Sequence, residues 1–272
     1  MAVETNKEKS MIAYRWQRRI ERAQELRNRY PYAREILGFY IQVAGFQNEL
    51  YGSLPELLST EPLNQCPPLE NSEVWDLTSR FVTFLGMAGE HGPETLRNMS
   101  RELQSQGSQF CSELLRQAWQ NFSASSAAEL LATAFLQPCA EFLLSKARKP
   151  ASWPNPGLCP FCGRKPGFAI LRPFGDGAAR SLACTFCLNE WEFRRILCAG
   201  CGEQTEQKLP VFTAGDNIRV ECCDSCRTYI KTIDLTKDGN AEPIVDEMAS
   251  APLDLWAQER GYAKLHRNLL GI

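Results

Sequence analysis

The sequence predicts an α + small β protein, in which an all-helical N-terminal domain precedes two tandem four-cysteine modules and a helical C-terminal tail. Three observations carry this prediction. Apolar residues recur at helical spacing through the first half, four Cys-x-x-Cys pairs repeat with a fixed period in the second half, and a proline-rich segment lies between them. The expected parts are a helical domain over 1–150, a linker over 151–157, cysteine modules over 158–196 and 197–240, and a tail over 241–272.

The first half consists of stretches rich in helix-forming residues that glycine and proline interrupt. Pro93 suits a first helical position, and Ser126 with Glu129 has the spacing of a capping box. Pro138 is expected to kink or break the last helix of the domain, because proline donates no backbone hydrogen bond. The expected helices span 8–29, 32–51, 73–90, 93–106, 108–122 and 126–147, and a loop is expected over 61–70.

The proline-rich stretch 150–157 cannot continue a helix and favours an extended connector. Beyond it the apolar runs are short, and each lies close to a cysteine turn. The expected strands are 168–171, 180–183, 191–197 and 229–235. From Pro243 the pattern becomes helical again, with an expected break at Pro252, and we expect this tail to pack against the rest of the protein.

Eight of the twelve cysteines form two copies of one pattern, C-x2-C-x21-C-x2-C. The second copy follows the first at one constant offset, so that Cys159 corresponds to Cys198 and Cys187 to Cys226. Two residues between cysteines allow a tight turn to direct both sulfurs at one point, and a second turn supplies the other two corners of a tetrahedron. The predicted metal ligands are Cys159, Cys162, Cys184 and Cys187 in site 1, and Cys198, Cys201, Cys223 and Cys226 in site 2.

The spacing predicts two metal ions without choosing the metal. Tetrahedral all-sulfur sites suit zinc and rubredoxin-type iron equally, so the modules are of the rubredoxin-like or zinc-ribbon type. A module of about 35 residues buries too little apolar surface to fold alone. We therefore expect each bound ion to supply folding free energy on the order of 10 kcal/mol.

A disulfide framework is the alternative to metal binding. The chain opens with a polar, charged stretch (ETNKEK, residues 4–9) rather than with a basic head and an apolar signal core, so we expect a reducing, cytoplasmic environment. Cys66, Cys111 and Cys139 are then expected to be small buried apolar residues. Cys222 adjoins the predicted ligand Cys223 and is expected to point away from it, with a redox-sensitive thiol or an alternative ligand as the other possibilities.

The charge of the chain disfavours a partner with many phosphates. The formal net charge is -2, and residues 159–235 contain ten basic and nine acidic side chains. Eight thiolates with two divalent ions bring this segment to about -3. A zinc-ribbon nucleic-acid-binding protein, which needs positive charge to neutralise phosphates, is therefore a less favoured alternative. The longest apolar stretch, 36–46, is far shorter than the roughly 20 residues of a membrane span, so we expect no membrane insertion.

Enzyme motifs are absent from the sequence. It contains no P-loop, no dinucleotide-binding glycine motif and no HExxH motif. The two histidines, His91 and His266, lie near no Ser or Cys nucleophile pattern, so we predict no catalytic residue and no enzymatic activity. Trp191 lies between the two modules, where it suits contact with a partner and packing between the modules equally well.

The second half resembles the formate dehydrogenase accessory proteins (FdhE type). The similar segments are CPFCG at 159–163, RSLAC at 180–184, EW at 190–191, ECCDSC at 221–226, YIK at 229–231 and LDLW at 253–256. In the first half, the expected helix that starts at Tyr32 resembles the first core helix of that family. The resemblance covers most of the chain and is most specific from Cys159 to about Gly261.

The resemblance implies a non-enzymatic, cytoplasmic factor that is needed for maturation of formate dehydrogenase and binds its catalytic subunit. It also implies that the two four-cysteine modules bind iron, whereas the spacing alone allows zinc equally. A rubredoxin-type electron carrier is a further alternative, which requires a redox-active iron and an electron-transfer partner.

Overall fold

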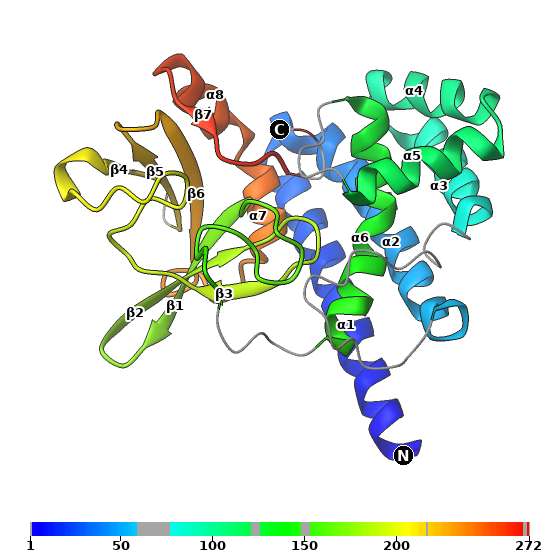
Figure 1. The fold of residues 1–272 in the computed structure, drawn as a ribbon, viewed down its shortest axis with the longest axis horizontal. Coiled ribbons are helices and arrows are strands. Elements are labelled where there is room, and N and C mark those ends of the chain that lie inside the picture. Colours follow the sequence, from blue (N-terminus) through cyan, green and yellow to red (C-terminus); the bar gives the residue numbers. More distant parts are fainter. Residues whose placement is uncertain are drawn as a thin grey trace. The chain divides into compact units, whose positions relative to one another are not determined.

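Figure 1 shows the fold in a computed structural model, which describes residues 2–58, 77–120, 126–147, 153–215, 217–268 and 271. The chain divides into a helical unit that ends at Lys146 and a β-rich unit that begins at Ala147. The loop expected over 61–70 lies outside the described residues, as does Cys66. The finer domain limits expected from the sequence remain a prediction.

The helical unit confirms the predicted all-helical N-terminal region. Its helices are α1 (Ala2–Arg29), α2 (Arg34–Leu57), α3 (Thr78–His91), α4 (Glu94–Ser105), α5 (Ser108–Gln120) and α6 (Ala127–Lys146), with a short 3-10 helix over Pro31–Ala33. The core contains an aromatic cluster whose ring centroids lie 5.1 to 6.3 Å apart: Phe46, Phe81, Phe84 and Phe135. The predicted capping box is present, because the Ser126 and Glu129 side chains each accept a hydrogen bond from the other residue's backbone N–H.

Helix α6 continues through Pro138, so of the expected kink or break the break does not occur. Proline cannot donate to the carbonyl four residues earlier, which belongs to Ala134. The Gln47 side chain of α2 donates to that carbonyl instead, with Nε2 at 2.5 Å from the oxygen. A side chain from a neighbouring helix therefore replaces the backbone donor that the proline lacks.

Helix α6 is also the one helix of the described residues that is long and apolar enough to cross a membrane. Residues 36–46, which the sequence indicated as the longest apolar stretch, belong to a different helix, α2. However, 67% of the apolar stretch of α6 is buried inside the protein. A central core helix has the same composition, and its burial here accounts for the apolar character.

The β-rich unit is built from one sheet that both cysteine modules share (Figure 1). The strands are β1 (Phe168–Phe174), β2 (Gly177–Ala183), β3 (Glu190–Glu192), β4 (Val211–Ala214), β5 (Ile218–Cys223) and β6 (Thr228–Asp234), in the order β3-β2-β1-β6-β5-β4. Each module contributes an antiparallel three-stranded meander. A parallel pairing of β1 with β6 joins the meanders, with Phe168 opposite Lys231. The repeat in sequence is thus a repeat of strands.

The C-terminal tail packs against this sheet as expected. It forms α7 (Pro243–Ala249), α8 (Ala251–Glu259) and the short strand β7 (Ala263–Lys264), which pairs in parallel with β6. One apolar cluster combines both modules with the tail: Ala169, Leu182, Phe193, Ile230 and Leu265. A second cluster joins β5 and β6 to the tail: Val220, Cys222, Tyr229, Ala257 and Tyr262. The modules and the tail therefore share their core.

Some element limits differ from those expected. Strands β4 and β5 lie where the sequence predicted no strand, and β3 ends at Glu192 although a strand was expected to continue to 197. The tail breaks at Ser250, and Pro252 lies in the first turn of α8, where a missing backbone donor has no cost. Pro93 lies directly before the first residue of α4, where a missing backbone donor also has no cost.

Candidate metal centres

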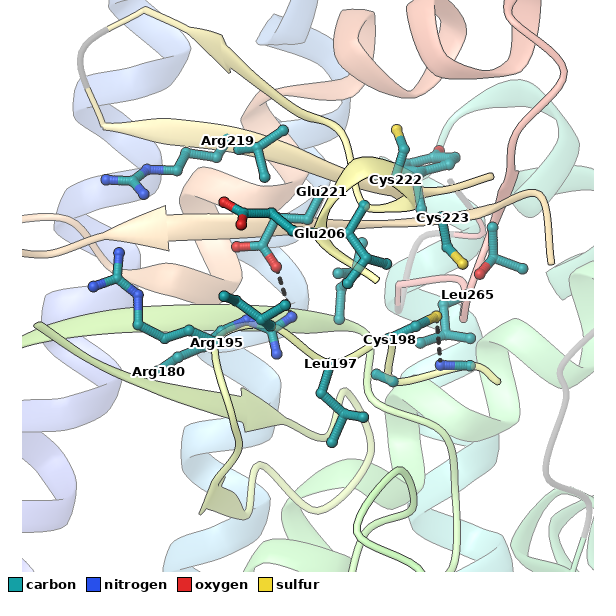
Figure 2. A pocket seen from close by; sticks show the side chains of 18 of the residues that line it. Arg180, Arg195, Leu197, Cys198, Glu206, Arg219, Glu221, Cys222, Cys223 and Leu265 are labelled. Carbon is teal, nitrogen blue, oxygen red and sulfur yellow. Dashed lines mark hydrogen bonds and ion pairs between the residues drawn. The ribbon is translucent and has the colours of Figure 1, made fainter. Parts of the chain in front are cut away.

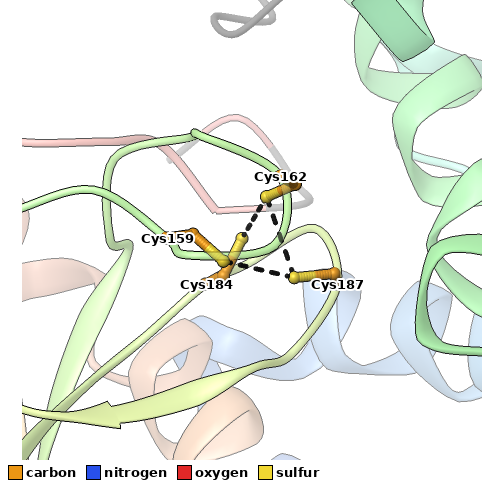
Figure 3. A group of neighbouring side chains, drawn as sticks. All are labelled: Cys159, Cys162, Cys184 and Cys187. Atoms are coloured by element: carbon orange, nitrogen blue, oxygen red, sulfur yellow. Dashed lines mark hydrogen bonds between the residues drawn. The ribbon is translucent and has the colours of Figure 1, made fainter. Parts of the chain in front are cut away.

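The first four cysteines come from two turns that face each other, as Figure 3 shows. The Sγ atoms of Cys159 and Cys187 are 3.5 Å apart, those of Cys162 and Cys184 are 3.4 Å apart, and those of Cys162 and Cys187 are 3.7 Å apart. All four side chains are buried. The structure thus brings the predicted residues of site 1 together.

The second quartet repeats this geometry in the second module. Cys198 Sγ lies 3.7 Å from Cys226 Sγ, and Cys201 Sγ lies 3.7 Å from Cys223 Sγ. These two pairs are the repeat equivalents of the pairs between the two turns in site 1. In both quartets the ligand atoms all lie within 4.8 Å of one another.

The turns have the same backbone conformation in both sites. Gly163 and Gly202, which follow the first Cys-x-x-Cys pair of each module, have φ values of 70° and 77°. Leu188 and Arg227, which follow the second pair, have φ values of 54° and 55°. A left-handed residue after the second cysteine reverses the chain, so that both sulfurs of each turn point to the same side.

Polar groups in the same turns contact the sulfurs. The backbone N–H of Phe186 donates to Cys184 Sγ at 3.4 Å, and that of Gly200 donates to Cys198 Sγ at 3.3 Å. Asn189 Nδ2 lies 3.9 Å from Cys159 Sγ. Such donors favour the thiolate form, which is the form that binds metal.

The repeat equivalent of Asn189 is Thr228, whose hydroxyl lies 3.0 Å from Cys226 Sγ. Burial opposes ionisation of Cys226, but hydrogen bonds with Thr228, Cys201 and Cys223 together outweigh it and lower the pKa of this thiol to about 7. A thiol with this pKa is about half ionised at neutral pH, and its thiolate is the form that binds a metal ion.

The quartets fit a tetrahedral metal ion. A zinc–sulfur distance of about 2.3 Å places the sulfurs of a tetrahedron about 3.8 Å apart, close to the observed separations. Rubredoxin-type iron suits the same four thiolates. In site 1, a hydrogen bond with Cys159 raises the pKa of Cys162 well above its usual value, and a separate hydrogen bond with Cys159 does the same to the pKa of Cys187. Four thiolates crowded together need a cation, because uncompensated buried charges repel one another.

The two sites differ in their exposure to solvent. Site 1 is closed, since its cysteines are at most 3% exposed. In site 2 only Cys223 is buried, Cys198 and Cys226 are half-buried, and Cys201 is exposed. The repeat therefore preserves the ligand geometry but not the cover around it.

A cavity of about 430 Å³ lies beside site 2, between the two modules (Figure 2). Cys198 and Cys223 form part of its wall, and its apolar lining includes Leu197 and Leu265. Arg180 crosses from the first module and donates to Glu221 of the second, 2.6 Å away. The cavity thus gives solvent a second approach to site 2.

A buried charge cluster holds the tail against β6. Lys231 Nζ lies 2.7 Å from Asp254 Oδ2 and 3.0 Å from Glu247 Oε1, and Lys264 Nζ lies 3.1 Å from Asp254 Oδ1. All four side chains are at most 4% exposed. Burial alone raises the pKa of Glu247, but Lys231 and Lys264 more than offset it and hold that pKa at about 2. The carboxylate is therefore ionised in the folded protein.

The described cysteines outside the two quartets, Cys111, Cys139 and Cys222, are packing residues. Cys111 and Cys139 are fully buried, as predicted. Cys222 and Cys223 point in different directions (Figure 2), and Cys222 belongs to the apolar cluster that contains Tyr229. Burial raises the pKa of its thiol to about 12. Its expected orientation is confirmed, and a thiol with this pKa is a poor ligand or redox group.

The structure also shows where Trp191 and the two histidines lie. Trp191 packs against the shared core, and its Nε1 donates to the Pro156 carbonyl at 2.9 Å, which favours packing over contact with a partner. His91 is half exposed, near Glu90. Burial lowers the pKa of His266.

Sequence reasoning missed several residues that shape these centres. They are the donors Asn189 and Thr228 and the cavity residues Arg180 and Glu221. Comparison of the two repeats position by position could have found the first two, because they are equivalent polar residues that follow a cysteine turn. The charge pair joins strands of different modules, and no local pattern marks it.

Comparisons with known proteins show what this region is similar to. Residues 158–195 match the central domain of FdhE, and residues 196–270 match the C-terminal domain of FdhE. Both quartets lie inside these matches.

Relatives and a solved structure extend the similarity to most of the chain. A protein FdhE homolog from Aquifex aeolicus is 29% identical over 93% of this chain and 94% of its own length. One from Pseudomonas aeruginosa is 34% identical over 42% of this chain and 39% of its own. The crystal structure of the FdhE protein from Pseudomonas aeruginosa superposes with a TM-score of 0.71 at 25% identity, covering 94% of this chain and 95% of that one.

Proposed function

From the match of residues 158–195 and 196–270 to the central and C-terminal domains of FdhE, we propose that the chain is a non-enzymatic, cytoplasmic factor in the maturation of formate dehydrogenase. The observation that carries the proposal is the pair of four-sulfur clusters inside those two domains. Each cluster would hold one metal ion and thereby keep its part of the sheet folded. The client would be the catalytic subunit of the enzyme.

The eight repeat cysteines are the proposed ligands. Cys159, Cys162, Cys184 and Cys187 would hold one ion, and Cys198, Cys201, Cys223 and Cys226 would hold the other. When bound, iron would supply a one-electron redox couple, and zinc would supply a structural link only. The family resemblance favours iron, and the sulfur geometry accepts either ion.

Exposed apolar side chains on the β-rich unit support a protein partner. Leu255 of α8 is 62% exposed, and Phe212 of β4 is 37% exposed. The Phe212 ring packs on Trp256 with centroids 4.8 Å apart, next to Leu255 in the chain. Exposed apolar side chains on elements that touch each other, here β4 and α8, are typical of protein-binding surfaces. We call Phe212, Leu255 and Trp256 the apolar patch and propose that it contacts the client.

Capture of the client tests this function. The full metal-loaded chain is immobilised, and the catalytic subunit of formate dehydrogenase from the same organism is passed over it. The double variant Phe212→Ser, Leu255→Ser should weaken binding by about tenfold or more, since apolar anchors dominate such interfaces. Phe174→Ser, at the exposed end of β1, is the matched control and should leave binding unchanged. The proposal would be refuted if the metal-free protein and the double variant both bound the client as tightly as the unaltered, metal-loaded chain.

An electron carrier is the second candidate, because the exposure of Cys201 brings site 2 to the surface. Such a carrier needs iron in site 2 and a reversible couple. Protein from iron-replete cells should then be red and lose its colour with dithionite. Colourless protein with two zinc ions per chain would exclude this candidate.

A further inference from the structure

We propose that the two metal centres differ in how readily they release their metal ions. Site 2 releases its ion to dissolved thiols and chelators through Cys201, while site 1 retains its ion. The inference rests on the metal-holding part of the proposed function. It concerns which centre reacts, and it does not depend on the client or on whether the ion is iron or zinc.

The first observation is the unequal access to the ligands. Cys201 is exposed, and its repeat equivalent Cys162 is 3% exposed. A thiolate at the surface meets incoming ligands directly. A buried thiolate reacts only after the structure around it opens, which costs free energy.

The second observation is that the cover of site 1 is missing from site 2 at equivalent positions. Phe161 and Phe186 are buried in the turns of site 1, at 4% and 1% exposure. Their repeat equivalents in site 2 are Gly200 and Ser225, and both are exposed. The Arg164 guanidinium lies over the Phe186 ring, 3.5 Å from its centroid. The sequence thus places large side chains around one centre and small ones around the other.

The third observation is the cavity beside site 2. Cys198 and Cys223 are in its wall (Figure 2). The centre is therefore accessible from the cavity as well as at the exposed Cys201. The cysteines of site 1 are not among the residues that line this cavity.

Exchange at site 2 needs no redox partner. An external thiolate forms a bond to the metal ion, and the bond between the ion and Cys201 Sγ breaks. The released Cys201 thiolate takes a proton from water, and the charge of the four-sulfur centre is unchanged. Repetition with further thiolates, or with a chelator, removes the ion.

Zinc release measures the difference. The full chain, loaded with two zinc ions, is mixed with an excess of the colorimetric chelator pyridylazoresorcinol. We expect two phases of equal size, with the faster about tenfold or more above the slower, because only site 1 must open first. One phase containing both ions would overturn the proposal.

Substitution of the residue that covers each site shows which phase of zinc release belongs to which site. Ser225→Phe copies Phe186 into site 2 and should slow the fast phase, whereas Phe186→Ser should speed the slow phase. Since either change can disturb folding, the unaltered zinc-loaded chain is also treated briefly with iodoacetamide and analysed by mass spectrometry. Cys201 should be alkylated before Cys162, and equal or reversed labelling would contradict the proposal.

The outcomes separate this inference from the proposed function. A chain that binds no metal would rule out both this inference and the proposed function. A chain with two ions that leave at one rate would remove only the difference between the sites, and it would leave the maturation role untouched.

Discussion

Gln47 Nε2 donates a 2.5 Å hydrogen bond to the carbonyl oxygen of Ala134, across the interface between α2 and α6. Pro138 leaves this carbonyl without its usual helical donor, and both side chains, Gln47 and Pro138, are buried. The pair explains why a long apolar helix tolerates a proline in the core of the helical unit. A buried polar side chain here stabilises a neighbouring backbone.

The substitution Gln47→Leu should therefore lower the free energy of unfolding, by an amount that depends on whether residue 138 is proline. In the unaltered background it leaves the Ala134 carbonyl unsatisfied, which costs about 1–3 kcal/mol. In a Pro138→Ala background the restored backbone N–H takes over, so Gln47→Leu should cost roughly 1 kcal/mol less. Urea unfolding of the four chains, followed by helical circular dichroism, measures the coupling. Identical costs in both backgrounds would show that the hydrogen bond has no role.

Lys231→Met should detach the tail from the sheet. The change leaves Asp254 and Glu247 buried with Lys264 as the remaining cation of the cluster, and breaking a buried ion pair costs about 3–5 kcal/mol. Hydrogen exchange over α7 and α8 should rise with the loss of stability. Arg172→Met is the matched control, because Arg172 pairs with Glu190 at the surface and such a pair contributes about 1 kcal/mol or less. Equal effects of the two changes would contradict the role of the cluster.

Glu247 predicts a pH dependence of stability. Its pKa is about 2 in the folded protein, against an ordinary value of 4.5. Its contribution is therefore complete above about pH 4.5 and is lost as the pH falls towards 2, and the difference corresponds to about 3 kcal/mol. The stability of the unaltered chain relative to Glu247→Gln should follow this curve. Metal loss in acid affects both chains, so it cancels in the difference, and a difference independent of pH would refute the prediction.

Cys159→Ser should disturb both modules but spare the helical unit. Loss of the first ion removes the folding free energy of the first module, and β1 then no longer supports β6 of the second. Hydrogen exchange measured by mass spectrometry should rise over 168–183 and, to a smaller degree, over 228–234. Exchange in α2 and α6 should stay unchanged. Faster exchange in those helices would show that the two units do not fold separately.

The sequence predicted the helices and the cysteine quartets because both follow local rules. Apolar spacing marks a helix, and the constant period of the repeat assigns Cys159 to the same position in its module as Cys198. The capping box at Ser126 is equally local, since it needs a partner only three residues away. The helices and the capping box are complete within one segment, and the quartets follow from a fixed spacing along the chain.

The remaining features depend on contacts between distant residues. The parallel pairing of Phe168 with Lys231 joins strands that are far apart in the chain, and no pattern in either strand indicates it. Lys231 and Asp254 are charged, and charged residues are expected at the surface unless their partners are known. The donor from Gln47 to Ala134 is missed for the same reason. The different covers of the two sites, in contrast, were present in the sequence as Phe186 and Ser225.

Native mass spectrometry of the purified chain tests the central claim most directly, namely that eight cysteines form two separate metal centres. The account predicts two metal ions per chain, and one ion each for Cys184→Ser and Cys223→Ser. A metal-free chain whose mass is lowered by disulfide formation, or a single change that removes both ions at once, would contradict it.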